Sequence, residues 1–133
     1  MCSSDLDMFS FYDQNELSLV VNEGVKINEL AETMRGTSAV LLQCRPESNR
    51  NDQVIFTVRN VIYADARDLN GHSDAVAVLP YKEVRSIGVE NPGGLMGESQ
   101  LRLDFKGGKS ITFKFKGKAD VAALGKAVLA VIG

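Results

Sequence analysis

The segment 101–116 constrains the fold of this chain more than any other part of the sequence. Apolar and polar residues alternate over residues 101–106 and again over residues 111–116, with Gly107-Gly108 between them. Because neighbouring side chains of a strand point to opposite faces, each half buries an apolar face and exposes a charged one. The glycine pair suits the positive φ angles of a tight turn. The pattern therefore predicts an antiparallel hairpin.

The flanking regions predict more strands and one helix. Apolar stretches separated by turn residues lie at Ser38–Arg45, Gln53–Val58, Val61–Ala66, Ala75–Leu79 and Val84–Glu90. A nearly uncharged helical stripe follows the hairpin at Val121, Leu124, Val128, Leu129, Val131 and Ile132. A helix this apolar is expected to be largely buried. The sequence thus predicts an α+β, mainly β fold, in which seven mostly antiparallel strands form a barrel closed by a C-terminal helix that begins near Ala119.

Residues 7–36 precede this barrel, which we place at residues 37–133. Leu17–Val21 is apolar and fits either a strand or a helical turn. From Val25 onward apolar residues recur at spacings of three and four, which predicts an extra amphipathic helix outside the barrel. Gly24 or Asn28 could begin this helix, and Gly36 suits its end.

The first six residues resemble the translation of a common sequencing-adapter end. They read Met-Cys-Ser-Ser-Asp-Leu. We treat residues 1–6 as an artefact and leave them out of the fold prediction.

The charge of the chain is unevenly distributed. The net charge of −2 argues against nucleic acid as a partner. Residues 1–34 carry seven acids and one base, whereas residues 35–133 carry ten acids and fourteen bases. The acidic segment could pair with the basic part in the same chain or in a neighbouring subunit, or its charges could simply be solvated.

Residue types that carry chemistry are scarce and scattered. Cys2 and Cys44 lack metal-site spacing, and the single His72 lies in a polar loop without an evident partner. The glycines at 93, 94 and 97 lack the Lys-Ser/Thr of a phosphate loop. We therefore predict no catalytic residue, metal or cofactor. The absence of a signal peptide and of a long apolar run predicts a cytoplasmic protein.

Two strings resemble bacterial pleckstrin-homology-like (PH-like) domains. Gln53–Asp65 is similar to the family's hairpin "apolar-Phe-Thr-x-x-Arg-apolar-apolar-x-x-Asp", although Val61 stands where the family often has a basic residue. Leu79–Val84 is similar to its "Ile-Pro-Tyr-x-x-Ile". The resemblance covers about residues 38–132. It implies the barrel fold of PH and GRAM domains and little chemistry, and some members of the family form homo-oligomeric rings.

One group of lysines is the candidate binding face for an anion or a partner, and a solvated strand face is the alternative. The group is Lys106, Lys109, Lys114, Lys116 and Lys118. The N-terminal segment also has more apolar residues than a small barrel needs, namely Phe9, Phe11, Tyr12, Leu17, Leu19, Val20 and Val21. We therefore predict a non-catalytic interaction or scaffold module that forms a homo-oligomer and could bind a protein partner. The alternative is a peripheral module that binds anionic lipid weakly through the lysines.

Overall fold

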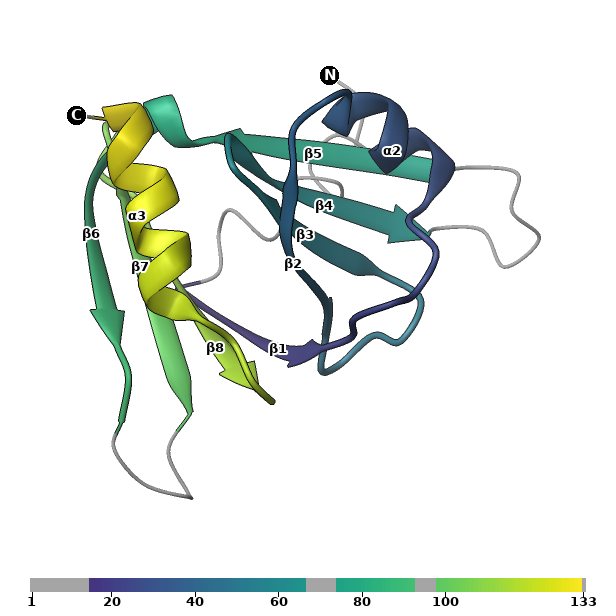
Figure 1. Ribbon diagram of the computed structural model, residues 1–133, viewed down its shortest axis with the longest axis horizontal. Helices are drawn as coiled ribbons and strands as arrows, with labels where there is room; N and C mark the ends of the chain where they lie inside the picture. The colour runs from purple at the N-terminus through teal and green to yellow at the C-terminus, as the bar shows by residue number, and fades with distance from the viewer. Residues whose placement is uncertain (1–14, 67–73, 93–97, 133) are drawn as a thin grey trace.

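The computed structural model describes residues 15–66, 74–92 and 98–132, and within these ranges eight strands form one curled sheet (Figure 1). The strands are β1 (Glu16–Val21), β2 (Val40–Pro46), β3 (Gln53–Thr57), β4 (Asn60–Ala66), β5 (Asp74–Pro80), β6 (Val84–Glu90), β7 (Ser99–Phe105) and β8 (Ser110–Lys116). The helices are α2 (Glu29–Arg35), the short 3-10 helix η2 (Tyr81–Glu83) and α3 (Val121–Ile132). Residues 1–6 lie outside the described residues.

The sheet has one more strand than the sequence predicted. Its order is β5-β4-β3-β2-β1-β8-β7-β6, and every pair is antiparallel except β1 with β8. The extra strand is β1, formed by the apolar stretch whose structure the sequence left open. Leu17 and Leu19 are buried, whereas Ser18 between them is only half-buried. This alternation is that of a strand covering the core, so the prediction of seven strands was wrong by one.

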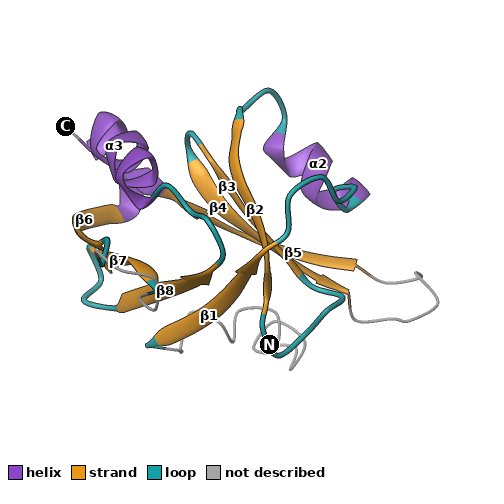
Figure 2. Ribbon diagram, turned by 60° about the horizontal axis from the view of Figure 1, so that its bottom comes forward, coloured by secondary structure: helices purple, strands orange, loops and turns teal. Residues whose placement is uncertain are grey.

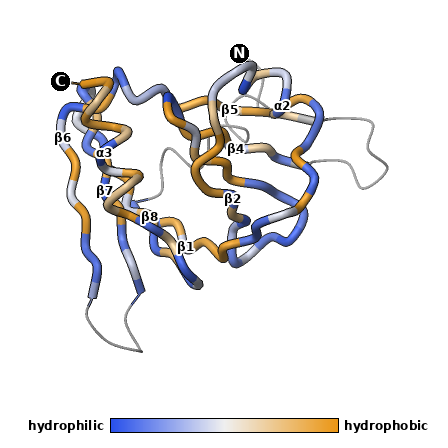
Figure 3. Tube along the Cα trace, viewed as in Figure 1, coloured by the Kyte–Doolittle hydropathy of each residue, from blue (hydrophilic) through white to orange (hydrophobic). Residues whose placement is uncertain are grey.

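The predicted hairpin and closing helix are both confirmed. In the hairpin Leu101 lies opposite Phe113 and Leu103 opposite Ile111, and all four side chains are fully buried. Gly108 has a φ of 92°, which favours glycine in the turn. Figure 3 shows that α3 is hydrophobic along most of its length.

The buried face of α3 is narrower than the sequence predicted. Its face with Val121, Leu124 and Val128 is buried, but Leu129 and Val131 remain 52% and 41% exposed. Both exposed residues flank the buried stripe, because a helix resting on a sheet offers only one side to it.

The main core joins the two halves of the curled sheet. Phe56 of β3 contacts Phe113 and Phe115 of β8 edge-to-face, with ring centroids 5.1 and 5.5 Å apart. Edge-to-face pairs of this kind add to the stabilisation from apolar burial. The strands β3 and β8 are not neighbours in the sheet, so these contacts hold its curvature.

A second, smaller apolar cluster lies under α2, on the outer face of the first half of the sheet. Ala31 of α2 packs with Ile55, Ile62 and Ala64 from β3 and β4. Figure 2 shows α2 beside β5 and α3 beside β6, at opposite ends of the sheet. The predicted extra helix is therefore confirmed.

The helix α2 begins at Glu29, four residues after the apolar periodicity starts. The backbone before it is held by two glutamine side chains: Gln43 donates to the carbonyl of Val25, and Gln53 bonds Lys26 and Asn28. The side chain of Asn28 then accepts from the N–H groups of Leu30 and Ala31 as the N-cap.

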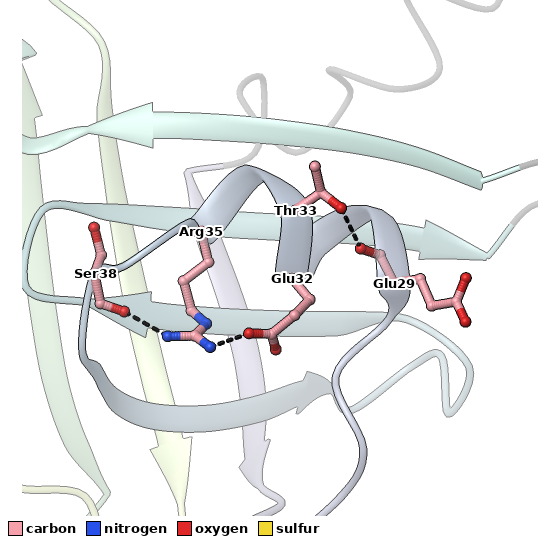
Figure 4. Close-up of polar contacts among 5 residues, drawn as sticks. All are labelled: Glu29, Glu32, Thr33, Arg35 and Ser38. Atoms are coloured by element: carbon pink, nitrogen blue, oxygen red, sulfur yellow. Dashed lines mark hydrogen bonds and ion pairs between the residues drawn. The ribbon is translucent and has the colours of Figure 1, made fainter.

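The end of α2 is fixed by Arg35 and Gly36. The Arg35 guanidinium donates to the Ser38 carbonyl oxygen at 2.8 Å and to the Glu32 carboxylate (Figure 4). Gly36 follows with a φ of 60°, as the sequence predicted for the cap.

Candidate functional site

The predicted lysines are distributed along β8 and are not gathered at one point. Lys114 and Lys116 lie on the outer face of β8, Lys106 and Lys109 lie in the turn before it, and Lys118 follows it. A seven-residue strand spans about 23 Å. The five amines therefore outline a long strip and not a pocket around one phosphate-sized group.

The two lysines of the strand are paired with carboxylates. The Lys114 amine lies 3.1 Å from the Glu16 carboxylate on β1, and the Lys116 amine lies 2.5 Å from that of Glu47. Glu16 belongs to the acidic N-terminal segment, so this contact is a pairing of the acidic and basic parts within the chain. Exposed ion pairs contribute at most about 1 kcal/mol each.

The Lys116–Glu47 pair reaches across β1. Lys116 is on β8, whereas Glu47 follows β2, on the far side of β1. The hydrogen bond and the negative charge of Glu47 raise the pKa of Lys116, so the amine stays protonated near neutral pH. Charges that could attract a membrane are thus partly neutralised within the chain.

A cavity of about 290 Å³ opens beside the β7–β8 turn. It is lined by Glu83, Phe105, Lys106, Gly107, Lys109 and Ile111. The N–H of Lys106 donates to the carbonyl of Glu83 at 3.0 Å, which holds the turn against the end of η2. The lining is mostly apolar and includes two lysines and one glutamate. The structure therefore brings Lys106 and Lys109 together at an apolar hollow.

Asp104 is the centre of a polar cluster on the outer face of β6, β7 and β8. Its carboxylate accepts from the hydroxyls of Ser110 and Ser86 at 2.6 and 2.8 Å and from Nε of Arg102 at 2.9 Å. These donors hold the pKa of Asp104 at about 2. All of its partners are on the same sheet, so the cluster ties neighbouring strands together.

The buried polar side chains also serve the structure. The hydroxyl of Tyr81 donates to the carbonyl of Thr57 at 2.7 Å, and that of Tyr63 donates to the Asp52 carboxylate at 2.6 Å. Burial is the first cause that raises the pKa of both phenols, so they remain protonated donors. Burial likewise raises the pKa of the Cys44 thiol to about 12, and the residue is a buried free thiol.

Other candidate features give no metal or membrane site in the part of the chain described. No group of three potential metal ligands occurs within residues 15–66, 74–92 and 98–132. None of the helices in these ranges combines the length and apolar character needed to cross a bilayer. His72 and the glycines at 93, 94 and 97 lie outside the described residues.

The sequence did not reveal two exposed apolar side chains, one on the strand at the end of the sheet and one on the helix beside it. Val89 of β6 and Leu129 of α3 are 49% and 52% exposed. A Cβ placed on Gly125 of α3 would lie 3.2 Å from both Ile87 and Val89, so β6 packs closely against α3 at this point. Leu129 follows Gly125 by about one turn of the helix. Sequence reasoning missed these residues because the position of β6 at the end of the sheet is known only from the tertiary structure.

Comparisons with known proteins agree with this geometry. The family model described as "Bacterial PH domain" matches residues 48–132. A DUF1696 family protein with a pleckstrin-homology domain from Shewanella loihica aligns with a TM-score of 0.59 and 21% identity, over 87% of this chain and 98% of its own.

Two more solved structures share the fold. A PH-domain-containing protein from Exiguobacterium sibiricum aligns with a TM-score of 0.56 and 17% identity, over 86% of this chain and 62% of its own. A pleckstrin homology domain from Shewanella amazonensis aligns with a TM-score of 0.51 and 20% identity, over 84% of this chain and 92% of its own. No curated protein matches the chain.

Proposed function

The chain belongs to the family of bacterial PH domains, and we propose that it is a non-catalytic scaffold module of the cytoplasm that self-associates through β6 and α3. Domains of this kind are generally binding modules, and the hydroxyls of Tyr63 and Tyr81 both donate to partners within the chain. The proposal rests on two exposed apolar side chains, Val89 of β6 and Leu129 of α3.

Val89 lies on β6, which is one of the two edge strands among those described. Five of the seven residues of β6 are exposed, and among the described strands it pairs with β7 alone. The other open edge, β5, also has seven residues. Unpaired edge strands readily add a further strand, and a second copy of the chain supplies an edge of matching length. Because about half of each side chain is already covered, burying the rest of Val89 and Leu129 would contribute roughly half of the 1.5–3 kcal/mol that full burial of such a side chain gives.

The oligomeric state tests this proposal. Light scattering after size exclusion should show an oligomer for the wild type at about 0.15 M salt, where exposed charges are screened beyond about 8 Å. Val89→Lys with Leu129→Lys should shift it to the monomer. The matched control is Leu30→Lys with Met34→Lys on α2, since these residues are also exposed apolar side chains. A monomeric wild type, or equal dissociation by both pairs, would refute the assignment.

Lipid binding is the weaker alternative. The ion pairs of Lys114 and Lys116 reduce the charge available to a membrane, and each basic group near an anionic surface contributes only about 1 kcal/mol. We expect little binding to phosphatidylserine vesicles at about 0.15 M salt. If a monomer bound these vesicles tightly, and replacing Lys114 and Lys116 by glutamate abolished the binding, lipid binding would be the better supported function.

A further inference from the structure

The cavity beside the β7–β8 turn has the chemistry of a peptide-binding site. Phe105 and Ile111 provide apolar surface, and the amines of Lys106 and Lys109 carry positive charge. At about 290 Å³ it is at the small end of ligand pockets. It therefore suits an aromatic side chain with an acidic neighbour better than a large cofactor. Glu83 on the same wall disfavours a dense polyanion.

The chain itself carries a segment of this composition. Residues 7–13 read Asp-Met-Phe-Ser-Phe-Tyr-Asp, which places three aromatic residues between two aspartates. The aromatic rings match the apolar lining, and the aspartates match the two amines. Charge and hydropathy are therefore complementary between this segment and the cavity.

The direction of β1 places its first described residues near the cavity. The N–H of Thr112 donates to the carbonyl of Asn15 at 2.9 Å, and Glu16 lies opposite Thr112 in the parallel pair of β1 with β8. The chain therefore enters the sheet at the start of β8, next to Ile111 of the cavity lining. An extended chain covers at most about 3.6 Å per residue, so Phe9 lies within about 22 Å of Asn15. Phe11 and Tyr12 are closer still.

We propose that residues 7–13 bind in the same chain to the cavity at the β7–β8 turn, with an aromatic side chain inside and aspartates facing Lys106 and Lys109. The segment then covers apolar surface and gives the acidic N-terminal region a defined partner. This contact is independent of the self-association surface on β6 and α3.

Photo-crosslinking of the full chain tests the proposal. Phe11→p-benzoylphenylalanine should crosslink to residues 105–111, whereas Met34→p-benzoylphenylalanine on α2 should not. A mixture of light and heavy isotope-labelled protein should give crosslinks only between fragments with the same label. Crosslinks that map elsewhere, or that join light and heavy chains, would overturn the intrachain site.

Charge reversal separates specific binding from mere proximity. Lys106→Glu with Lys109→Glu should abolish most of the crosslink, and Lys82→Glu with Lys118→Glu should retain it, since all four lysines are exposed. Raising the ionic strength from about 0.1 to 1 M, which shortens the Debye length from about 10 to 3 Å, should also lower the yield. A yield unaffected by both treatments would refute the role of the amines. Circular dichroism checks that each variant is folded.

Discussion

Replacing Leu19 by alanine tests whether β1 is an integral part of the core. The Leu19 side chain is fully buried, and its strand is enclosed by Pro46 of β2 on one side and Phe115 of β8 on the other. Truncating a buried leucine to alanine costs about 2–5 kcal/mol, and the cost rises with the cavity that remains. Because β1 is fixed by strands on both sides, the site cannot collapse easily. We expect a loss in the upper part of this range.

Urea denaturation followed by circular dichroism measures this loss as a lower midpoint with an unchanged slope. The total stability of a domain is about 5–15 kcal/mol, so Leu19→Ala should remove a large share of it. Val20→Ala is the matched control, because Val20 is on the opposite, half-buried face of the same strand. If Leu19→Ala costs no more than Val20→Ala, β1 is a peripheral attachment and the argument for an eight-stranded core fails.

Two titratable groups give further predictions. The pKa of Asp104 is held near 2 in the folded state, below the ordinary value of about 3.9, so its stabilisation is complete above about pH 4 and is lost as the pH falls toward 2. Urea midpoints measured across this window should fall less for Asp104→Asn than for the wild type; parallel curves would contradict this. Burial raises the pKa of Cys44 to about 12, so a disulfide reagent at pH 8 should label it only after unfolding. Rapid labelling of the native Cys2→Ser variant, in which Cys44 is the one remaining cysteine, would show that this thiol is accessible.

Local sequence patterns predicted the elements whose evidence lies within their own residues. The alternation from Leu101 to Phe115 and the apolar stripe from Val121 determine one hairpin and one helix, and both are present. The beginning of α2 was harder to predict. Its N-terminal boundary depends on Gln43 and Gln53, which bond the chain from 18 to 27 residues away.

Long-range relationships could not be read from the sequence. A stretch as short as Leu17–Val21 has no decisive periodicity, and nothing local indicates that it pairs in parallel with β8. Lys114 and Lys116 lie on the outer face of β8, as the alternation of the hairpin predicted. The pairing of Lys116 with Glu47 was not foreseen, because Glu47 is 69 residues from Lys116 and both are brought together by β1.

The position of β1 connects these observations. By pairing with both β2 and β8, it converts two half-sheets into one sheet, whose only edges among the described strands are β5 and β6. Any partner that extends the sheet must therefore add at β5 or β6. Because β1 runs parallel to β8, its first residue, Glu16, lies opposite Thr112 near the start of β8, where the β7–β8 turn ends. A contact within the chain at that turn and a contact between chains at β6 use different surfaces, so one need not displace the other.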